Sequence, residues 1–158
     1  SGDAKGIRCP VGAHIRRVNP RGQPIQGQGV PGGSNNSHRL TRCLLPYGPT
    51  YDPRKPYDGL ERGILGYFIN SNIENQYEFV LRRWVNDGEF AGAVRLDPRS
   101  KDPLIGTQDP AEGIFVIPQA DGGPPIEVMG LSTFVTTKAA AYVFLPSITA
   151  IKFIANVA

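Results

Sequence analysis

The feature that most constrains the fold is a change in the spacing of apolar residues between positions 63 and 86. Residues 63–70 (GILGYFIN) form an apolar and aromatic run, which is typical of a buried strand. From Asn72 onward, apolar residues recur every three or four positions up to Trp84. This spacing predicts a helix over residues 72–86, with Asn72 as its N-cap. A strand followed by an amphipathic helix indicates an α+β protein.

The remaining elements are predicted from shorter signals. We expect one strand at residues 38–47, ended by Pro46, a second at 139–145, and a final helix at 147–156. Residues 48–61 and 88–132 should be mostly connecting chain. Within the second of these stretches, short apolar pieces lie at 114–117 and 126–129. The order strand, strand, helix, strand, helix matches a ferredoxin-like unit that lacks its first strand and first helix. The 19 glycines and 15 prolines disfavour a helical bundle.

The length and composition indicate a single partial domain over residues 1–158. Residues 19–37 form a Gly/Pro-rich stretch that we interpret as a long surface loop or a disordered one. The stretch contains a GxGxxG match at residues 27–32, but no strand precedes it and no helix follows, so we reject a dinucleotide site. The net charge of +3 is not concentrated in one block, and no apolar run is long enough to span a membrane. We therefore expect neither a nucleic acid nor a membrane as partner.

The two cysteines match no metal-binding pattern. Cys9 and Cys43 lie 34 residues apart, which fits neither a zinc spacing nor a CxxC motif. We expect ordinary reduced thiols, which weakly favours a cytoplasmic location, while a disulfide stays open because sequence does not give the geometry.

Two residues could carry chemistry, and each has two interpretations from the sequence alone. His14 precedes two arginines and is either a metal ligand or a surface or structural histidine. Arg42 lies in an apolar strand and is either a strand-edge residue with its head in water or a buried cation that stabilises negative charge.

Four segments together resemble the C-terminal part of the dye-decolourising-type haem peroxidases. They are CPVGAHIRRVNPR (9–21), HRLTRCLLPYGP (38–49), RGILGYFINSNIENQYEFVLRRWVND (62–87) and FVTTKAAAYVFLPS (134–147). The string DPLIG (102–106) lies where that family often has a similar one. The resemblance covers nearly the whole chain. It implies the C-terminal half of a double ferredoxin-like fold, an antiparallel sheet with helices on one face.

The resemblance also implies an activity and its residues. The family reduces hydrogen peroxide with haem b and oxidises dyes or phenolic compounds. His14 matches the proximal histidine that ligates the iron, and Arg42 matches the distal arginine. Arg17 and Arg21 are candidates for contacts with the haem propionates. Asp102 is the candidate carboxylate for the second imidazole nitrogen, with a simple Asp-Pro turn as its alternative.

The chain departs from the family pattern in ways that matter for activity. The family's GxxDG motif, which carries a distal aspartate, is absent from this sequence. Gly66 stands where many members have a bulky residue, and the alanines at residues 139–141 replace a glycine-containing string that is more usual in the family. We therefore expect the chain to bind haem weakly alone and to need an upstream half of the same protein, or a homo-oligomer. A non-catalytic haem-binding or assembly module of the same fold stays open as the alternative.

Overall fold

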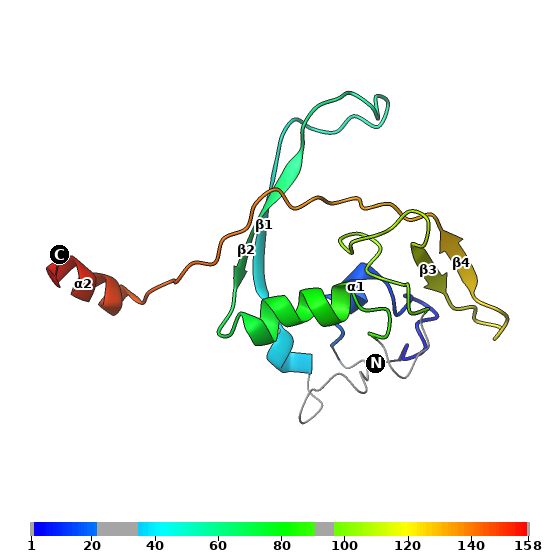
Figure 1. The fold of residues 1–158 in the computed structure, drawn as a ribbon, viewed down its shortest axis with the longest axis horizontal. Coiled ribbons are helices and arrows are strands. Elements are labelled where there is room, and N and C mark those ends of the chain that lie inside the picture. Colours follow the sequence, from blue (N-terminus) through cyan, green and yellow to red (C-terminus); the bar gives the residue numbers. More distant parts are fainter. Residues whose placement is uncertain (1, 22–34, 91–96, 158) are drawn as a thin grey trace.

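The computed structural model describes residues 2–21, 35–90 and 97–157. It contains short helices, two hairpins and a C-terminal helix (Figure 1). In chain order the elements are α1 (His14–Arg17), η1 (Asn35–His38), β1 (Thr41–Tyr47), β2 (Gly63–Ile69), η2 (Glu74–Glu78), η3 (Val80–Val85), β3 (Ile114–Ile117), β4 (Ile126–Met129) and α2 (Ile148–Val157). Part of the loop expected at 19–37 lies outside the described residues, and its last positions begin η1.

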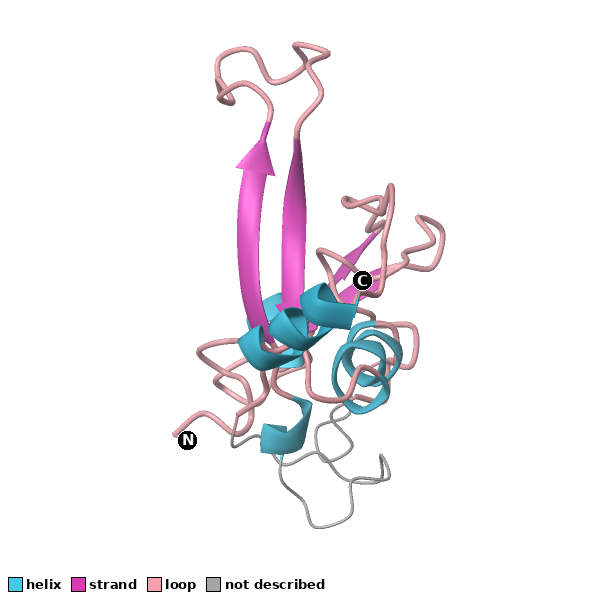
Figure 2. Ribbon diagram, turned by 90° about the vertical axis from the view of Figure 1, so that its left-hand side faces the viewer, coloured by secondary structure: helices cyan, strands magenta, loops and turns pink. Residues whose placement is uncertain are grey.

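The longer hairpin pairs β1 with β2 in an antiparallel register that runs from Thr41 opposite Ile69 to Tyr47 opposite Gly63. It stands away from the helices, with the 48–62 loop at its far end (Figure 2). Both strands lie where the apolar runs predicted them. The prediction that Pro46 ends the first strand is wrong, because Pro46 lies within β1, opposite Ile64. A proline is accommodated in an edge strand when its nitrogen faces away from the neighbouring strand.

The helix expected at residues 72–86 forms as two consecutive wide-turn segments, η2 and η3. Hydrogen bonds spanning five residues, such as Glu78 N–H to Ile73 O at 3.0 Å, give these segments their π-helical geometry. The Asn72 side chain accepts a hydrogen bond from the Asn75 N–H at 2.8 Å, as expected of a cap, although the residue that directly precedes η2 is Ile73. The C-terminal end of η3 is buried through Trp84 and Val85.

The core lies where η3 packs against the segment before α1, rather than on the hairpin. Its buried members are Val11, Val80, Trp84, Val85 and Phe90. The Trp84 and Phe90 rings meet edge to face, with their centroids 6.3 Å apart. This cluster fixes the position of α1 relative to η3.

The C-terminal part of the chain extends away from this core. After the β3–β4 hairpin, residues 131–147 form an extended strap that crosses the long hairpin and leads to α2 (Figure 1). The strand predicted at 139–145 is not formed, because no strand in the described ranges pairs with this segment. The final helix is confirmed, and Ser147 Oγ accepts from the Ala150 N–H at its start.

The architecture is α+β with two separate antiparallel hairpins, so the single sheet expected from the sequence is present only in part. Cys9 and Cys43 are free thiols, as expected. None of the helices in the described ranges has the length and apolar character needed to cross a membrane.

Candidate functional site

The structure brings together two of the residues singled out in the sequence, His14 and Asp102. His14 begins α1, and its Nδ1 lies 2.9 Å from Asp102 Oδ2 and 3.2 Å from Oδ1, across 88 residues of sequence. The side chain of Asp102 is fully buried, whereas that of His14 is 35% exposed. The imidazole is thus anchored on its Nδ1 side, which leaves Nε2 as the ring nitrogen not engaged by the carboxylate.

Asp102 is held in its ionised form by its hydrogen bonds. Burial alone raises the pKa of this carboxyl, but hydrogen bonds from His14 and from the N–H groups of Ile105 and Leu104 outweigh it, so the net pKa is lowered. The two backbone bonds measure 3.0 and 2.9 Å. An ionised carboxylate only accepts, so His14 Nδ1 carries the proton that is donated. Asp102 therefore both caps a turn and fixes the histidine tautomer.

Backbone contacts fix Asp102 in place. Its N–H donates to Val85 O at 2.7 Å, which joins it to the end of η3. Its carbonyl accepts from the Gln108 side-chain amide at 2.8 Å. The carboxylate therefore has little freedom to move relative to the core.

Arg17 does not have the role that the sequence suggested. Its guanidinium is fully buried and donates to the carbonyls of Gly12, Trp84, Asp87 and Ser100 and to Ser100 Oγ, at 2.7 to 3.4 Å. These acceptors match the five N–H donors of an arginine. The expected propionate contact is therefore corrected: Arg17 has no donor left for it. Burial lowers the pKa of Arg17 to about 10, so it stays cationic at neutral pH.

The buried guanidinium instead assembles the site. Its acceptors belong to the turn before α1, the end of η3 and the loop that precedes Asp102. These are the segments that carry His14 and Asp102. The Phe90 ring lies 5.1 Å from the guanidinium carbon and covers it. One side chain thus sets the separation of the two elements of the pair.

Arg42 and Arg21 do not contact the pair among the described residues. Arg21 is exposed, with a left-handed φ of 51°, and its carbonyl accepts from the Asn35 side chain. Arg42 lies in β1 opposite Phe68 and is exposed. Opposite residues share a face, and the Phe68 ring lies 5.2 Å from that of Tyr77 in η2. Arg42 is therefore on the face of the hairpin that is turned toward the helices.

The same face shows how the chain accommodates Gly66. A Cβ placed at Gly66 would lie 2.8 Å from the Phe68 ring and 3.3 Å from the Leu44 side chain. Phe68 and Leu44 therefore fill the space that a larger residue at Gly66 would need. The apolar cover next to Arg42 comes from these two neighbouring positions.

Sequence reasoning missed the supporting residues of the site. Ser100 and Gln108 are buried polar residues in a stretch that was interpreted as connection. They act through a backbone carbonyl and a side-chain amide, and neither leaves a pattern in the sequence. Trp84 was expected on the buried face of the helix, but nothing indicated that its carbonyl would receive Arg17.

The His14–Asp102 pair can be compared with the needs of a metal group that takes few protein ligands. In the described ranges no cluster of three or more His, Cys, Asp or Glu side chains is arranged to hold a metal ion. A haem iron needs a single protein ligand on its proximal side, because the porphyrin supplies the others. A histidine whose second nitrogen donates to a carboxylate is the usual form of such a ligand. The His14–Asp102 pair fits this group.

Comparisons with known proteins relate this chain to dye-decolourising-type peroxidases. No family model matches the chain. The dye-decolorizing peroxidase msp1 of Mycetinis scorodonius is 32% identical over 95% of this chain and 30% of its own length. The solved structure of DyP2 from Amycolatopsis sp. ATCC 39116 gives a TM-score of 0.63 at 27% identity, over 84% of this chain and 29% of that one. The DyP-type peroxidase of Anabaena sp. gives 0.61 at 29% identity, over 85% and 28%. The chain spans about 30% of the length of the relatives it matches.

Proposed function

Because the chain is homologous to dye-decolourising-type peroxidases over most of its length, as its motifs predicted, we propose that it supplies part of a haem peroxidase site. In this proposal His14 would be the protein ligand of haem b, and Arg42 would be the cation that acts on bound peroxide. The whole protein would reduce hydrogen peroxide and oxidise dyes or phenolic compounds. The observation that carries the proposal is the 2.9 Å contact between His14 Nδ1 and the buried carboxylate of Asp102.

The residues of the chain have separate tasks in this mechanism. Asp102 accepts a hydrogen bond from His14 Nδ1–H, fixes the tautomer and would increase the donor strength of Nε2 toward an iron. Arg17 keeps α1, η3 and the Asp102 loop in register. Arg42 would stabilise the negative charge that develops when peroxide is cleaved. Bound haem would supply the redox chemistry that these side chains lack.

The test uses the longer protein that contains this chain, because the chain covers about 30% of its relatives. The readouts are peroxide-dependent bleaching of an anthraquinone dye and the haem content of the purified protein. Arg42→Leu should lower turnover by roughly 100-fold or more, the scale for losing one transition-state donor, while haem content stays unchanged. His14→Ala should lose the haem.

Arg39→Leu is the matched control. Arg39 is an exposed arginine just before β1, so its loss should leave turnover and haem content unchanged. Equal turnover in Arg42→Leu and Arg39→Leu would contradict the distal assignment. An unchanged haem spectrum in His14→Ala would contradict the proximal one.

A second candidate function is a non-catalytic module that keeps the fold and takes part in assembly. It is favoured by the hairpin, where Leu44, Leu45, Ile64 and Leu65 are all exposed. Dye bleaching by the haem-loaded longer protein separates the two. Peroxide-dependent turnover that Arg42→Leu lowers would favour the enzyme, and haem binding without turnover would favour the module.

A further inference from the structure

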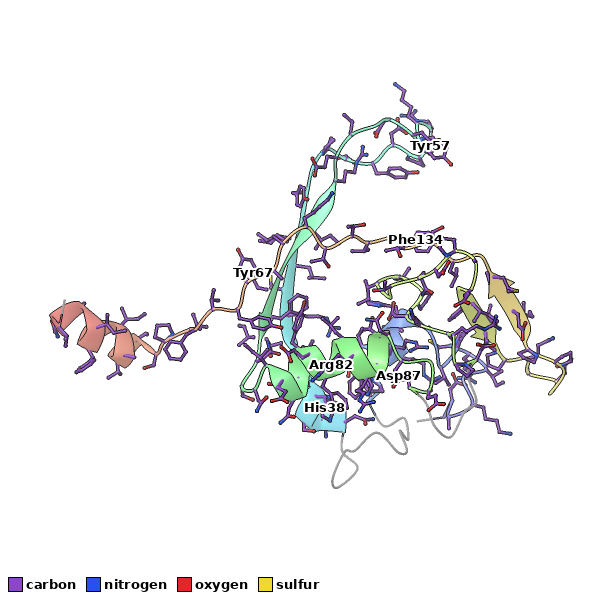
Figure 3. All side chains as sticks on the ribbon, viewed as in Figure 1. His38, Tyr57, Tyr67, Arg82, Asp87 and Phe134 are labelled. Carbon is purple, nitrogen blue, oxygen red and sulfur yellow. The ribbon has the colours of Figure 1, made fainter. Side chains whose placement is uncertain are left out.

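A buried histidine, His38, lies at the junction between the long hairpin and the η2–η3 helix. It is the last residue of η1 and is 7% exposed. In Figure 3 it lies beside the helix, at the foot of the hairpin and away from the 48–62 loop. The strand β1, which carries Arg42, begins three residues later at Thr41. Contacts of this side chain therefore bear on where the strand of Arg42 is held.

One nitrogen of the His38 ring is bound to the helix. Its Nδ1 forms a hydrogen bond with the carbonyl oxygen of Asn75 in η2. A carbonyl oxygen only accepts, so Nδ1 carries the proton and donates. The other nitrogen, Nε2, is buried and has no hydrogen-bond partner among the described residues. Because an unpaired buried polar atom is unfavourable, packing alone would favour an apolar ring here, and the Nδ1–H donor is what the histidine adds.

The His38 ring also packs against two aromatic residues of the helix. It stacks on Phe79, with the ring centroids 3.8 Å apart and the ring planes 10° from parallel. It meets Trp84 edge to face, with the centroids 5.4 Å apart. Trp84 is 1% exposed and belongs to the core. His38 thus attaches η1 to the core as well as to η2.

Gln76 fastens the same junction from the helix side. Its side-chain Nε2 donates to the carbonyl of Arg39 at 2.6 Å. Its Oε1 accepts from the N–H groups of Ser71 and Asn72 at 2.8 and 3.0 Å. Arg39 precedes β1 and Ser71 follows β2, so one side chain binds both strands of the hairpin at their foot.

The helix side of this junction also supports the candidate site. The Trp84 carbonyl accepts from the Arg17 guanidinium at 2.7 Å. The carbonyl of the next residue, Val85, accepts from the Asp102 N–H at 2.7 Å. A continuous set of contacts within the described residues therefore runs from the strand of Arg42 to Asp102, through the buried histidine.

We propose that His38 is a positioning residue that holds the strand of Arg42 in a fixed place relative to the His14–Asp102 pair. The inference rests on the proposed function, in which His14 holds the haem and Arg42 acts on bound peroxide. A misplacement of about 1 Å can slow a reaction by roughly 100-fold, so a residue distant from the reacting atoms can affect the rate. His38 acts through Arg42 and not on the reacting atoms.

The test uses the haem-loaded longer protein and two constants, kcat/KM for peroxide and kcat/KM for an anthraquinone dye. His38→Phe keeps an aromatic ring against Phe79 but removes the donor to Asn75. It should lower kcat/KM for peroxide about tenfold and leave haem content and kcat/KM for the dye unchanged, because Arg42 acts only in the peroxide step. His38→Asn places an amide N–H near the position of Nδ1 and should recover most of this loss.

A double substitution shows whether the effect passes through Arg42. If it does, His38→Phe added to Arg42→Leu should cause little further loss, because the positioned residue is already absent. A further tenfold loss in the double variant would indicate a general structural effect and overturn the proposal. Arg39→Leu is the matched control, since its side chain is exposed and its contact with Gln76 uses the carbonyl, which the substitution keeps. Its two constants should equal those of wild type.

Spin labels on Cys9 and Cys43 measure the positioning without turnover. Both are free thiols, and Cys43 is next to Arg42 in β1 while Cys9 lies in the segment before α1. With any cysteines outside these 158 residues replaced by serine, His38→Phe should widen the distribution of distances between the labels, and His38→Asn should not.

The label distances separate a failure of this inference from a failure of the proposed function. An unchanged distribution in His38→Phe would overturn the positioning role, even where Arg42→Leu slows the peroxide step. A widened distribution, together with normal peroxide kinetics in Arg42→Leu, would support the positioning role and refute the proposed role of Arg42.

Discussion

Replacing Arg17 by methionine should remove a large fraction of the stability of this chain. Methionine keeps much of the volume and apolar stem of arginine but donates no hydrogen bond. The substitution would leave the carbonyls of Gly12, Trp84, Asp87 and Ser100 without the donors that now reach them. It would also leave the buried Asp102 carboxylate without a nearby cation.

The size of the effect follows from these contacts. Removing one partner of a buried, hydrogen-bonded charge costs about 3–5 kcal/mol. Domains of this size have a total unfolding free energy of about 5–15 kcal/mol. Arg17→Met should therefore remove about a fifth of the stability or more, and Arg17→Lys most of that amount, because an ammonium group cannot reach acceptors arranged around a planar fork.

Urea unfolding followed by the fluorescence of Trp84 measures this directly, since Trp84 is the sole tryptophan and accepts from Arg17 through its carbonyl. Arg82→Met is the matched control. The Arg82 side chain is 66% exposed, and its Nη2 lies 3.8 Å from Glu78 Oε2. Removing this ion pair should lower the free energy of unfolding by less than about 0.5 kcal/mol. A loss below about 1 kcal/mol for Arg17→Met would refute the structural role and return Arg17 to the candidates for propionate binding.

Three further changes have defined expected outcomes. The pKa of Asp102 in the folded chain lies below its ordinary value of 3.8. The ionised carboxylate therefore stabilises the fold above pH 3.8, and this contribution is lost as the pH falls through the folded pKa. Asp102→Asn should make the urea midpoint less dependent on pH below 3.8. Asn72→Ala removes the N-cap of η2 and should cost about 1 kcal/mol in the same assay, whereas no loss would show that the cap is dispensable. Gly88→Ala would drive its Cβ into the Pro98 carbonyl, so a melting temperature equal to wild type would contradict the packing of this turn.

Local patterns predicted much of the fold. The strands at β1 and β2, the Asn72 cap and the final helix each depend on residues close together in sequence, so spacing and capping signals were sufficient. The strand expected at 139–145 failed for a different reason. Its sequence favours an extended conformation, but a strand also needs a neighbour, and no pattern within the segment indicates whether one is present.

The candidate site also depends on contacts between residues that are distant in the sequence. His14 and Asp102 are 88 residues apart, and the resemblance to a family, rather than spacing, suggested their contact. The role of Arg17 was predicted wrongly because the sequence next to a candidate ligand looks the same in two cases. The arginine can contact an anion, or it can be buried against backbone carbonyls, as Arg17 is. Carbonyl acceptors carry no side-chain signature, so Ser100 and the Trp84 carbonyl could not be identified from residue type.

The central claim is that His14 is the iron ligand and that Asp102 fixes its tautomer. The most direct test is the absorption spectrum of the purified chain during titration with haemin, beside His14→Gly with and without added imidazole. The account predicts weak binding with a histidine-ligated spectrum in wild type, loss of that spectrum in His14→Gly, and its return when imidazole fills the space. The same spectrum and affinity in wild type and in His14→Gly without imidazole would contradict the account.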